Sequence, residues 1–241
     1  LAKLGLDKSN CLIYFWSPLI IKETFNSTHL DIIGISLLTG SIYFLLCQRH
    51  KLATLFLAFG FLGKLYPVIL LPLFLKACYE KMAQAGKKPW PALLGNTSIF
   101  IGVVILGYLP FMGIGLQMFD GLKAFTLYWQ SNDSIFAILV FIFQTVSGEL
   151  ANQSILSNPL PIFLSKVTVA LVLIGVLFRL LYKETSLLEQ PVEYVRGLFW
   201  IMALVFLLSP VQNPWYLCWV VPFLCIFPTR SWIVLTGLVG L

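Results

Sequence analysis

The chain has 241 residues, of which 59% are hydrophobic and 11% are charged, and its formal net charge is +6. Soluble globular domains have a lower apolar share and about 25% charged residues, so the composition excludes that class. The basic residues lie in short segments between apolar blocks and form no continuous stripe, which favours a multi-pass membrane protein over a nucleic-acid-binding one. The five cysteines show no paired spacing, so neither a disulfide framework nor a metal site is predicted.

The positions of lysine and arginine predict how the chain crosses the membrane. Short loops that are rich in these residues stay in the cytoplasm. Polar turns that contain proline or asparagine fall between the basic clusters, so we place these turns on the extracytoplasmic side. The basic clusters are Lys3 and Lys8; Arg49 and Lys51; Lys76, Lys81, Lys87 and Lys88; Arg179, Lys183 and Arg196; and Arg230.

In chain order, the first apolar blocks predict an outward and a return crossing. With residues 1–8 in the cytoplasm, residues 10–21 form a short outward pass with Pro18 near its end, and residues 22–30 are extracytoplasmic. Residues 31–47 return, and residues 48–51 form a tight basic turn in the cytoplasm.

The next apolar block, residues 52–75, has positive charge on both sides, so a single crossing would place one basic cluster outside. The alternative is two shorter helices that turn at residues 63–67, with both ends cytoplasmic. Pro67 lacks a backbone donor and biases Tyr66 away from helical geometry, which favours this break. Lys64 lies at the break. A lysine at the bilayer centre costs roughly 2.5–3.5 kcal/mol, and we interpret it as functional, with snorkelling to the interface as the simpler alternative.

The remaining apolar segments differ in length from the roughly 20 residues that a straight crossing needs. Residues 135–146 are too short to span and predict a re-entrant or interfacial helix, whereas residues 121–129 are amphipathic and suited to the interface. The predicted order is an outward pass at 91–111, an outer loop at 112–134, an inward pass at 161–182, and short helices at 197–208 and 215–227 joined by an outer turn.

We expect a single all-α, polytopic transmembrane domain over residues 1–241, with short broken or re-entrant helices at its extracytoplasmic side. The chain starts at Leu1 with neither methionine nor a signal-peptide pattern. It ends at Leu241 within an apolar run that is too short to cross about 30 Å of hydrocarbon. We therefore expect a fragment that is truncated at both ends.

Polar residues gather in the outer-facing segments, which predicts a site at the extracytoplasmic interface. His29 and Asp31 lie at the start of a predicted span. Two positions apart, they would not share a face of a regular helix, but both could line a cavity in a non-helical entry. An equally supported interpretation is that Thr28 or Asp31 caps the helix. No further histidine or carboxylate at suitable spacing completes a metal site.

Aromatic and amide residues mark two more outer turns. For Trp129 alone, membership of the interfacial aromatic belt is the better interpretation. Gln212, Asn213, Trp215 and Tyr216 follow one another around a proline in a predicted re-entrant turn, and for them a binding site is favoured.

Four stretches that cover most of the chain carry a recognisable pattern. They are residues 17–23 with His29-Leu30-Asp31; residues 63–67 with Leu71-Pro72; residues 128–136; and Ser209-Pro210 with Pro214-Trp215-Tyr216-Leu217, Trp219 and Pro222-Phe223. Together, and in this order, they resemble the polyprenyl-phosphate-dependent glycosyltransferases of the GT-C superfamily, closest to glycosyltransferase family 87. Ser17 stands where this pattern often has asparagine, and Ser27-Thr28 stand where glycine often precedes the histidine.

The resemblance implies a membrane enzyme that transfers a sugar, usually mannose, from a polyprenyl phosphate to an acceptor hydroxyl with inversion. A carboxylate in the family's first extracytoplasmic loop acts as the base, and we expect this chain to lack that loop, which leaves Asp31 as the candidate within the sequence. Lys64 would contact the donor phosphate, and Tyr66 accompanies it at the break. His29 and Asp31 would contact sugar or acceptor. Trp129 and Asn132 would line the acceptor side, and Gln212, Asn213, Trp215 and Tyr216 would close the cavity.

The implied partners are the lipid-linked donor, a glycolipid or polysaccharide acceptor of the cell envelope, and the bilayer, with no nucleic acid. The donor is a substrate, and no cofactor is predicted. The implied location is the plasma membrane of a prokaryote in preference to the endoplasmic reticulum, with the site extracytoplasmic. A secondary transporter or lipid flippase is the alternative, because transporters also place charges at broken helices. Transporters, however, often show two corresponding halves, and the sequence has no internal repeat.

Overall fold

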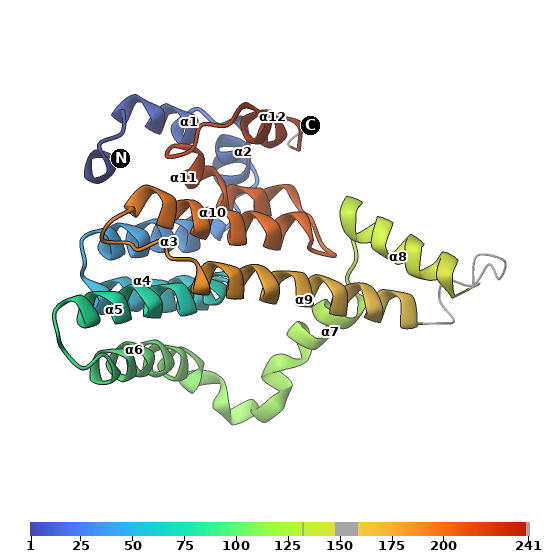
Figure 1. Ribbon diagram of the computed structural model, residues 1–241. Coiled ribbons are helices and arrows are strands. Elements are labelled where there is room, and N and C mark those ends of the chain that lie inside the picture. Colours follow the sequence, from blue (N-terminus) through green and yellow to red (C-terminus); the bar gives the residue numbers. More distant parts are fainter. Residues whose placement is uncertain (132, 148–158, 240–241) are drawn as a thin grey trace.

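The computed structural model describes residues 1–131, 133–147 and 159–239, and in this part of the chain every regular element is helical (Figure 1). The all-α prediction is therefore confirmed for these residues. The α-helices are α1 (Leu12–Phe15), α2 (Pro18–Ile21), α3 (Asp31–Leu46), α4 (His50–Gly63), α5 (Leu71–Gln84), α6 (Trp90–Tyr108), α7 (Asp120–Tyr128), α8 (Ser134–Val146), α9 (Leu160–Tyr182), α10 (Pro191–Leu207), α11 (Val221–Leu224) and α12 (Arg230–Leu238). Shorter 3-10 or π turns are η1 (Ala2–Leu4), η2 (Lys8–Cys11), η3 (Lys22–Asn26), η4 (Tyr66–Leu70), η5 (Leu109–Phe119) and η7 (Pro214–Trp219).

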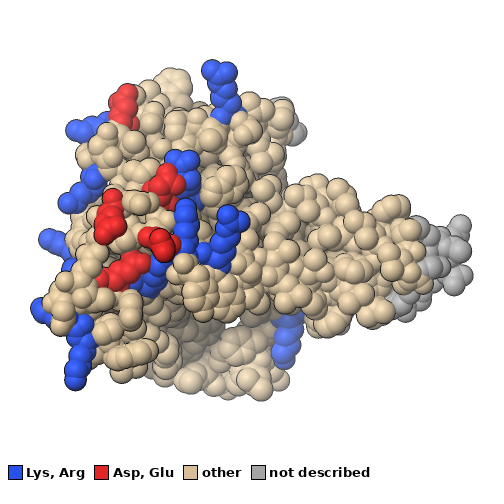
Figure 2. All heavy atoms as spheres, viewed as in Figure 1, with Lys and Arg blue, Asp and Glu red and all other residues tan. Residues whose placement is uncertain are grey.

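Six helices form a bundle in which neighbours pack side by side: α3 on α4, α4 on α5 and α6, α5 on α9, and α9 on α10 (Figure 1). The chain reverses direction between successive helices. The connections α3–α4, α5–α6 and α9–α10 therefore lie at one end of the bundle, on the left in Figure 1. The charged side chains visible in Figure 2 gather at this same end. The start of α3, the α4–η4 break and the α10–η7 turn lie at the opposite end, as the basic clusters predicted.

The predicted break at residues 63–67 is confirmed. Helix α4 ends at Gly63, Lys64 has extended backbone angles (φ −164°, ψ 141°), and η4 follows with Pro67 in its first turn. Proline cannot donate a backbone hydrogen bond, so the helix cannot continue through it. The break leaves Lys64 at the tip between two helices of the bundle.

Helices α3 and α4 approach each other closely because three glycines face one another. A Cβ on Gly60 would lie 3.6 Å from the carbonyl oxygen of Gly34, and a Cβ on Gly63 would lie 3.5 Å from the Gly34 Cα. Small residues at such crossings let helix backbones touch, as they do in membrane helix pairs. The contact places the first turn of α3 beside the last turn of α4.

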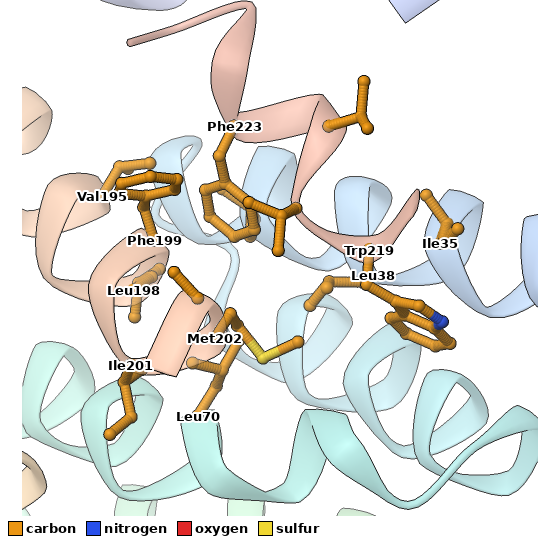
Figure 3. Close-up of a cluster of buried hydrophobic side chains, with 14 of the residues drawn as sticks. Ile35, Leu38, Leu70, Val195, Leu198, Phe199, Ile201, Met202, Trp219 and Phe223 are labelled. Carbon is orange, nitrogen blue, oxygen red and sulfur yellow. The ribbon is translucent and has the colours of Figure 1, made fainter. Parts of the chain in front are cut away.

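The core centres on Trp219 of η7, which is fully buried. Figure 3 shows its ring beside Leu38, with its indole nitrogen at the edge of the cluster and turned away from Phe223 and Met202. A Cβ on Gly34 would lie 2.5 Å from the ring carbon Cη2 of Trp219, so glycine at this position makes the space for the indole. The tryptophan is thus packed by its ring and leaves its N–H free to meet a polar group.

Two of the basic residues also tie loops together. The Lys76 ammonium donates to the carbonyl oxygens of Leu180 (3.1 Å) and Lys183 (2.6 Å) at the end of α9. The Lys81 ammonium donates to the Gln48 carbonyl oxygen (2.7 Å) in the α3–α4 turn. Cations stabilise helix C-termini because the last carbonyl groups carry partial negative charge.

Two predicted helices are wrong. Residues 10–21 form no single pass, because the chain leaves helical geometry between α1 and α2, where the Ser17 hydroxyl accepts a hydrogen bond from the Ile20 N–H (3.4 Å). Residues 215–227 form η7 and α11 in place of one helix. Proline at the start of each of these elements prevents a continuous ladder.

The remaining predicted helices are present, with shifted ends. Residues 121–129 fall in α7 and residues 135–146 in α8, whereas the helix predicted to begin at residue 197 starts at Pro191. Among the described residues, two helical stretches are long and apolar enough to cross a membrane, Trp90–Leu127 and Leu160–Tyr182, which suggests membrane association.

The close contact at Gly34 predicts that Gly34→Ala displaces Trp219 and destabilises the fold. Overpacking a tight core costs about 1–3 kcal/mol, which corresponds to a fall in Tm of roughly 3–10 °C for a chain of this size. Thermal unfolding of the purified protein in detergent measures the change. The matched control is Gly95→Ala in α6, where an added Cβ meets nothing within 4 Å. Equal Tm values for the two variants would contradict the close contact.

Candidate functional site

The site begins in the segment that enters α3. The backbone of Lys22–Asn26 forms a π turn closed by the Ser27 N–H donating to the Lys22 carbonyl oxygen (2.9 Å). Thr28 has a positive φ of 54°, which is unusual for a β-branched residue. Both features carry a conformational cost, and such costs cluster at functional segments.

Asp31 is the first residue of α3, where the partial positive charge of the helix N-terminus stabilises a carboxylate. The interpretation that Thr28 or Asp31 caps this helix is wrong. The N-cap position is Leu30, and no side-chain hydrogen bond caps the helix. The Asp31 side chain instead turns toward two other elements of the bundle.

The Asp31 carboxylate joins three parts of the chain. Its Oδ1 accepts from the Lys64 ammonium at 2.6 Å and from the Trp219 indole N–H at 2.6 Å. The Lys64 side chain is 22% exposed and that of Asp31 is 13% exposed, so the pair is largely removed from solvent. A charge buried to this degree requires a partner of opposite charge. This pair links the first turn of α3 to the α4 break and to η7.

Two tyrosines complete the surroundings of Lys64. The ammonium lies 3.9 Å from the ring centroid of Tyr216 and 5.6 Å from that of Tyr66. The Tyr66 ring packs edge-on against Tyr216 (5.7 Å) and Trp219 (6.3 Å). Cations are attracted to aromatic faces, more strongly when desolvated. We call Asp31, Lys64, Tyr66, Tyr216 and Trp219 the Asp31 cluster.

His29 and Glu23 form a second group beside it. Glu23 is only 4% exposed, and its Oε2 lies 3.3 Å from Nε2 of His29. The imidazole stacks on Trp215 with ring centroids 4.0 Å apart and an interplanar angle of 21°. Trp215 in turn meets Tyr216 edge-on at 5.7 Å, which joins the two groups. We call Glu23, His29 and Trp215 the His29 group.

Gln212 and Asn213 line a cavity of about 100 Å³ on another side of Tyr216, together with Ser134. The Gln212 side chain donates to the Leu207 carbonyl oxygen (2.8 Å), so its amide holds the turn after α10. The backbone here pairs with Ser131, which accepts from the Gln212 N–H (2.9 Å). The turn is thereby fixed next to the segment that follows α7.

Trp129 is 56% exposed and packs on Phe125 with ring centroids 5.7 Å apart, which agrees with an interfacial aromatic residue. Asn132 lies outside the described residues. The Lys166 ammonium donates to the carbonyl oxygens of Thr126 (2.5 Å) and Leu127 (3.3 Å) at the end of α7.

Sequence reasoning missed the parts played by Trp219 and Glu23. Trp219 belongs to one of the stretches that resemble the glycosyltransferases, but its sequence context indicates an apolar residue of a helix. Its partner Asp31 is 188 positions away. Glu23 lies in a polar segment that reads as exposed, whereas the structure buries it. The signal that was available is the match of the Glu23 and His29 positions to the glycosyltransferase pattern.

Each carboxylate of the two groups has a lysine nearby. The Lys22 ammonium lies 3.9 Å from Oε1 of Glu23, and Lys64 pairs with Asp31. In the described ranges, no group of three or more His, Cys, Asp or Glu side chains is placed to hold a metal ion. The arrangement offers an imidazole, a carboxylate oxygen and aromatic faces, which suits hydroxyl-bearing ligands such as sugars.

Residues 159–240, about a third of the chain, match the family described as the MptB C-terminal domain. MptB is a mannosyltransferase of the GT-C type, so this region is similar to the C-terminal part of such an enzyme. The matched region contains Gln212, Trp215, Tyr216 and Trp219, whereas Asp31 precedes it. No curated protein and no solved structure matches the chain.

The Asp31–Lys64 pair predicts that removal of one partner destabilises the fold more than removal of both. Lys64→Met leaves a buried carboxylate without its cation, at a cost of about 3–5 kcal/mol, or roughly 6–20 °C in Tm. The double variant Lys64→Met/Asp31→Asn is neutral and retains an oxygen for the Trp219 N–H, so it recovers most of the loss. Thermal unfolding measures both.

The exposed pair Asp120–Lys123 supplies the control, because its ammonium–carboxylate distance is 3.0 Å and both side chains are about 60% exposed. Exposed ion pairs contribute little, so Lys123→Met changes Tm by about 1 °C or less. A Lys64→Met variant as stable as Lys123→Met would contradict a buried, coupled pair.

Proposed function

We propose that the chain forms much of the substrate cavity of a multi-pass membrane glycosyltransferase of the GT-C type. The enzyme transfers a sugar, mannose in the first instance, from a polyprenyl-phosphate donor to an acceptor hydroxyl, with inversion at the anomeric carbon. The reaction takes place at the extracytoplasmic face of a prokaryotic plasma membrane, and the acceptor is a glycolipid or polysaccharide of the cell envelope.

The convergence of the Asp31 cluster carries this proposal. Residues that the resemblance assigned to donor and acceptor binding come from α3, the α4 break and η7, yet Asp31, Lys64 and Tyr216 meet within hydrogen-bond or cation–π distance. All three elements end at the extremity of the bundle opposite to the basic loops (Figures 1 and 2). The match to the MptB C-terminal domain covers the η7 part of the cluster.

Lys64 is suited to bind the donor phosphate through hydrogen bonds, because Asp31 already neutralises its charge. Its ammonium has three N–H donors, of which Asp31 takes one. The remaining donors reach a non-bridging oxygen of the donor phosphodiester, and they stabilise the charge that the leaving phosphate acquires. Because Asp31 cancels the charge of Lys64 in the resting site, binding depends on hydrogen bonds more than on net charge.

An open hollow of about 590 Å³ supports a lipid-linked donor. Its lining residues flank Glu23 in the chain. Trp16 and Phe25, both more than three-quarters exposed, line it together with Lys22. Aromatic residues with a nearby cation are typical of the zone where lipid headgroups meet acyl chains. A polyprenyl chain in this hollow would place its phosphate near the His29 group.

The multi-pass arrangement is supported by the exposed apolar side chains on the outer helices α6 and α9. Helix α9 presents a row of exposed apolar side chains where a soluble protein would place polar ones, and α6 does the same. Helices α3, α4 and α10 have 14–17 residues, shorter than a full crossing, and they lie inside the bundle. The exposed residues are Leu94, Ile101, Ile105 and Leu106 on α6, and Phe163, Leu171, Ile174 and Phe178 on α9.

The proposal predicts transfer of labelled mannose from polyprenyl-phosphate mannose by the full-length protein in membranes. Trp219→Phe keeps the buried ring and removes the N–H that bonds to Asp31. A hydrogen bond to a charged group contributes about 1.5–3 kcal/mol, so transfer falls about tenfold or more. Trp200→Phe is the control, because Trp200 packs on Phe199 and is nearly half exposed.

Equal transfer rates in Trp219→Phe and Trp200→Phe would show that the Asp31 cluster is not part of the active site. No transfer from any lipid-phosphate sugar would contradict the enzyme and favour a transporter, which uptake of labelled lipid or solute by proteoliposomes would then reveal.

A further inference from the structure

We propose that Glu23 is a positioning residue that holds the His29 imidazole for a hydrogen bond with a substrate hydroxyl. The substrate half of this inference rests on the proposed function, and the hold of Glu23 on His29 does not. The chemical class recognised is a sugar that offers a hydroxyl donor to the free edge of the imidazole.

The backbone fixes the two residues next to each other. The His29 N–H donates to the Glu23 carbonyl oxygen (2.9 Å), which the π turn and the left-handed Thr28 make possible. A regular helical turn would carry His29 away from Glu23, because residues six apart lie on different faces. The unusual backbone conformation of this segment therefore brings the Glu23 carboxylate to the His29 imidazole.

The carboxylate sets the orientation of the ring. The Glu23 Oε2 lies 3.3 Å from the Nε2 of His29, and a carboxylate only accepts hydrogen bonds, so in the proposed arrangement Nε2 carries the ring proton. When the ring carries this proton alone, its other nitrogen, Nδ1, is an acceptor. Within the described part of the chain, no residue donates a hydrogen bond to Nδ1.

Glu23 is more deeply buried than His29, as a positioning role of Glu23 requires. The side chain of Glu23 is 5% exposed and that of His29 is 31% exposed, so the carboxylate is out of reach of a substrate and the imidazole is within reach. Stacking on Trp215 blocks one face of the ring and leaves its edge. A sugar hydroxyl approaching Nδ1 meets an acceptor whose direction is fixed before binding.

Nitrogen NMR on the full-length protein in lipid nanodiscs tests the hold directly, with ¹⁵N-labelled histidine and His29→Gln to assign the signal. We expect a His29 Nε2–H proton that is protected from exchange with water. Glu23→Leu, which replaces the buried carboxylate with an apolar side chain of similar size, removes this protection. Glu23→Gln retains an accepting oxygen and restores it at least in part. Glu193→Leu, on the exposed Glu193–Arg196 pair, leaves it unchanged.

Steady-state transfer from polyprenyl-phosphate mannose tests the substrate half. Loss of one neutral hydrogen bond corresponds to about a 3- to 10-fold effect. Glu23→Leu therefore raises KM by that factor, with kcat and Tm nearly unchanged, since uniform binding is what is lost. Glu23→Gln recovers most of the affinity, and Glu193→Leu behaves as wild type.

A His29 proton that stays protected in Glu23→Leu would overturn the positioning role. Lost protection with an unchanged KM would overturn the contact with substrate and make the pair structural. If the wild-type protein transfers no sugar, the proposed function fails, and the nitrogen signals still decide whether Glu23 holds the ring.

Discussion

The buried pair of Asp31 and Lys64 is the constraint on which the arrangement of the site depends. Each charge would be costly alone in an apolar bundle, and each becomes tolerable only with the other at 2.6 Å. Asp31 must therefore start α3 at the level where α4 ends, which the glycine contact between the two helices permits. Trp219 adds a second donor to the same oxygen, so η7 is held at that level as well. One carboxylate oxygen thus aligns three elements that are distant in the chain.

The break at Lys64 and the side of the bundle that carries the basic loops could be predicted from the sequence, because both follow from local chemistry. Proline cannot occupy the interior of a helix without breaking or kinking it, and lysine-rich loops need no tertiary partner to be recognised. The partners of Lys64 could not be predicted in this way. The lysine reads as a free cation for a phosphate, whereas the structure gives it a carboxylate and two aromatic rings. Those partners come from parts of the chain that no periodic pattern connects.

The failures at residues 10–21 and 215–227 have a common physical cause. Each continuous apolar run was predicted to form one helix over its whole length. Pro18, Pro214 and Pro222 instead divide these segments into single turns. Short turns expose backbone groups, which are tolerated at membrane depth only where protein covers them. The two segments pack against each other, and η7 also packs against α3, where Trp219 and Phe223 are fully buried (Figure 3). Hydropathy identifies such segments as buried and says nothing about their backbone.

The division of the site between two parts of the chain bears on how the function arises. The region that matches the MptB C-terminal domain supplies aromatic rings and an indole N–H, and the part before it supplies the carboxylates, the imidazole and Lys64. Within the Asp31 cluster and the His29 group, the matched region contributes no charged side chain for a phosphate, and the earlier part contributes one aromatic ring, Tyr66, besides the imidazole. The contacts of Asp31 with Trp219, of Lys64 with Tyr216 and of His29 with Trp215 all cross between the two parts, so neither part by itself presents the full set of groups that the proposed lipid-linked sugar requires. A glycosyltransferase activity would therefore depend on residues of both parts, and the matched domain alone would not carry it.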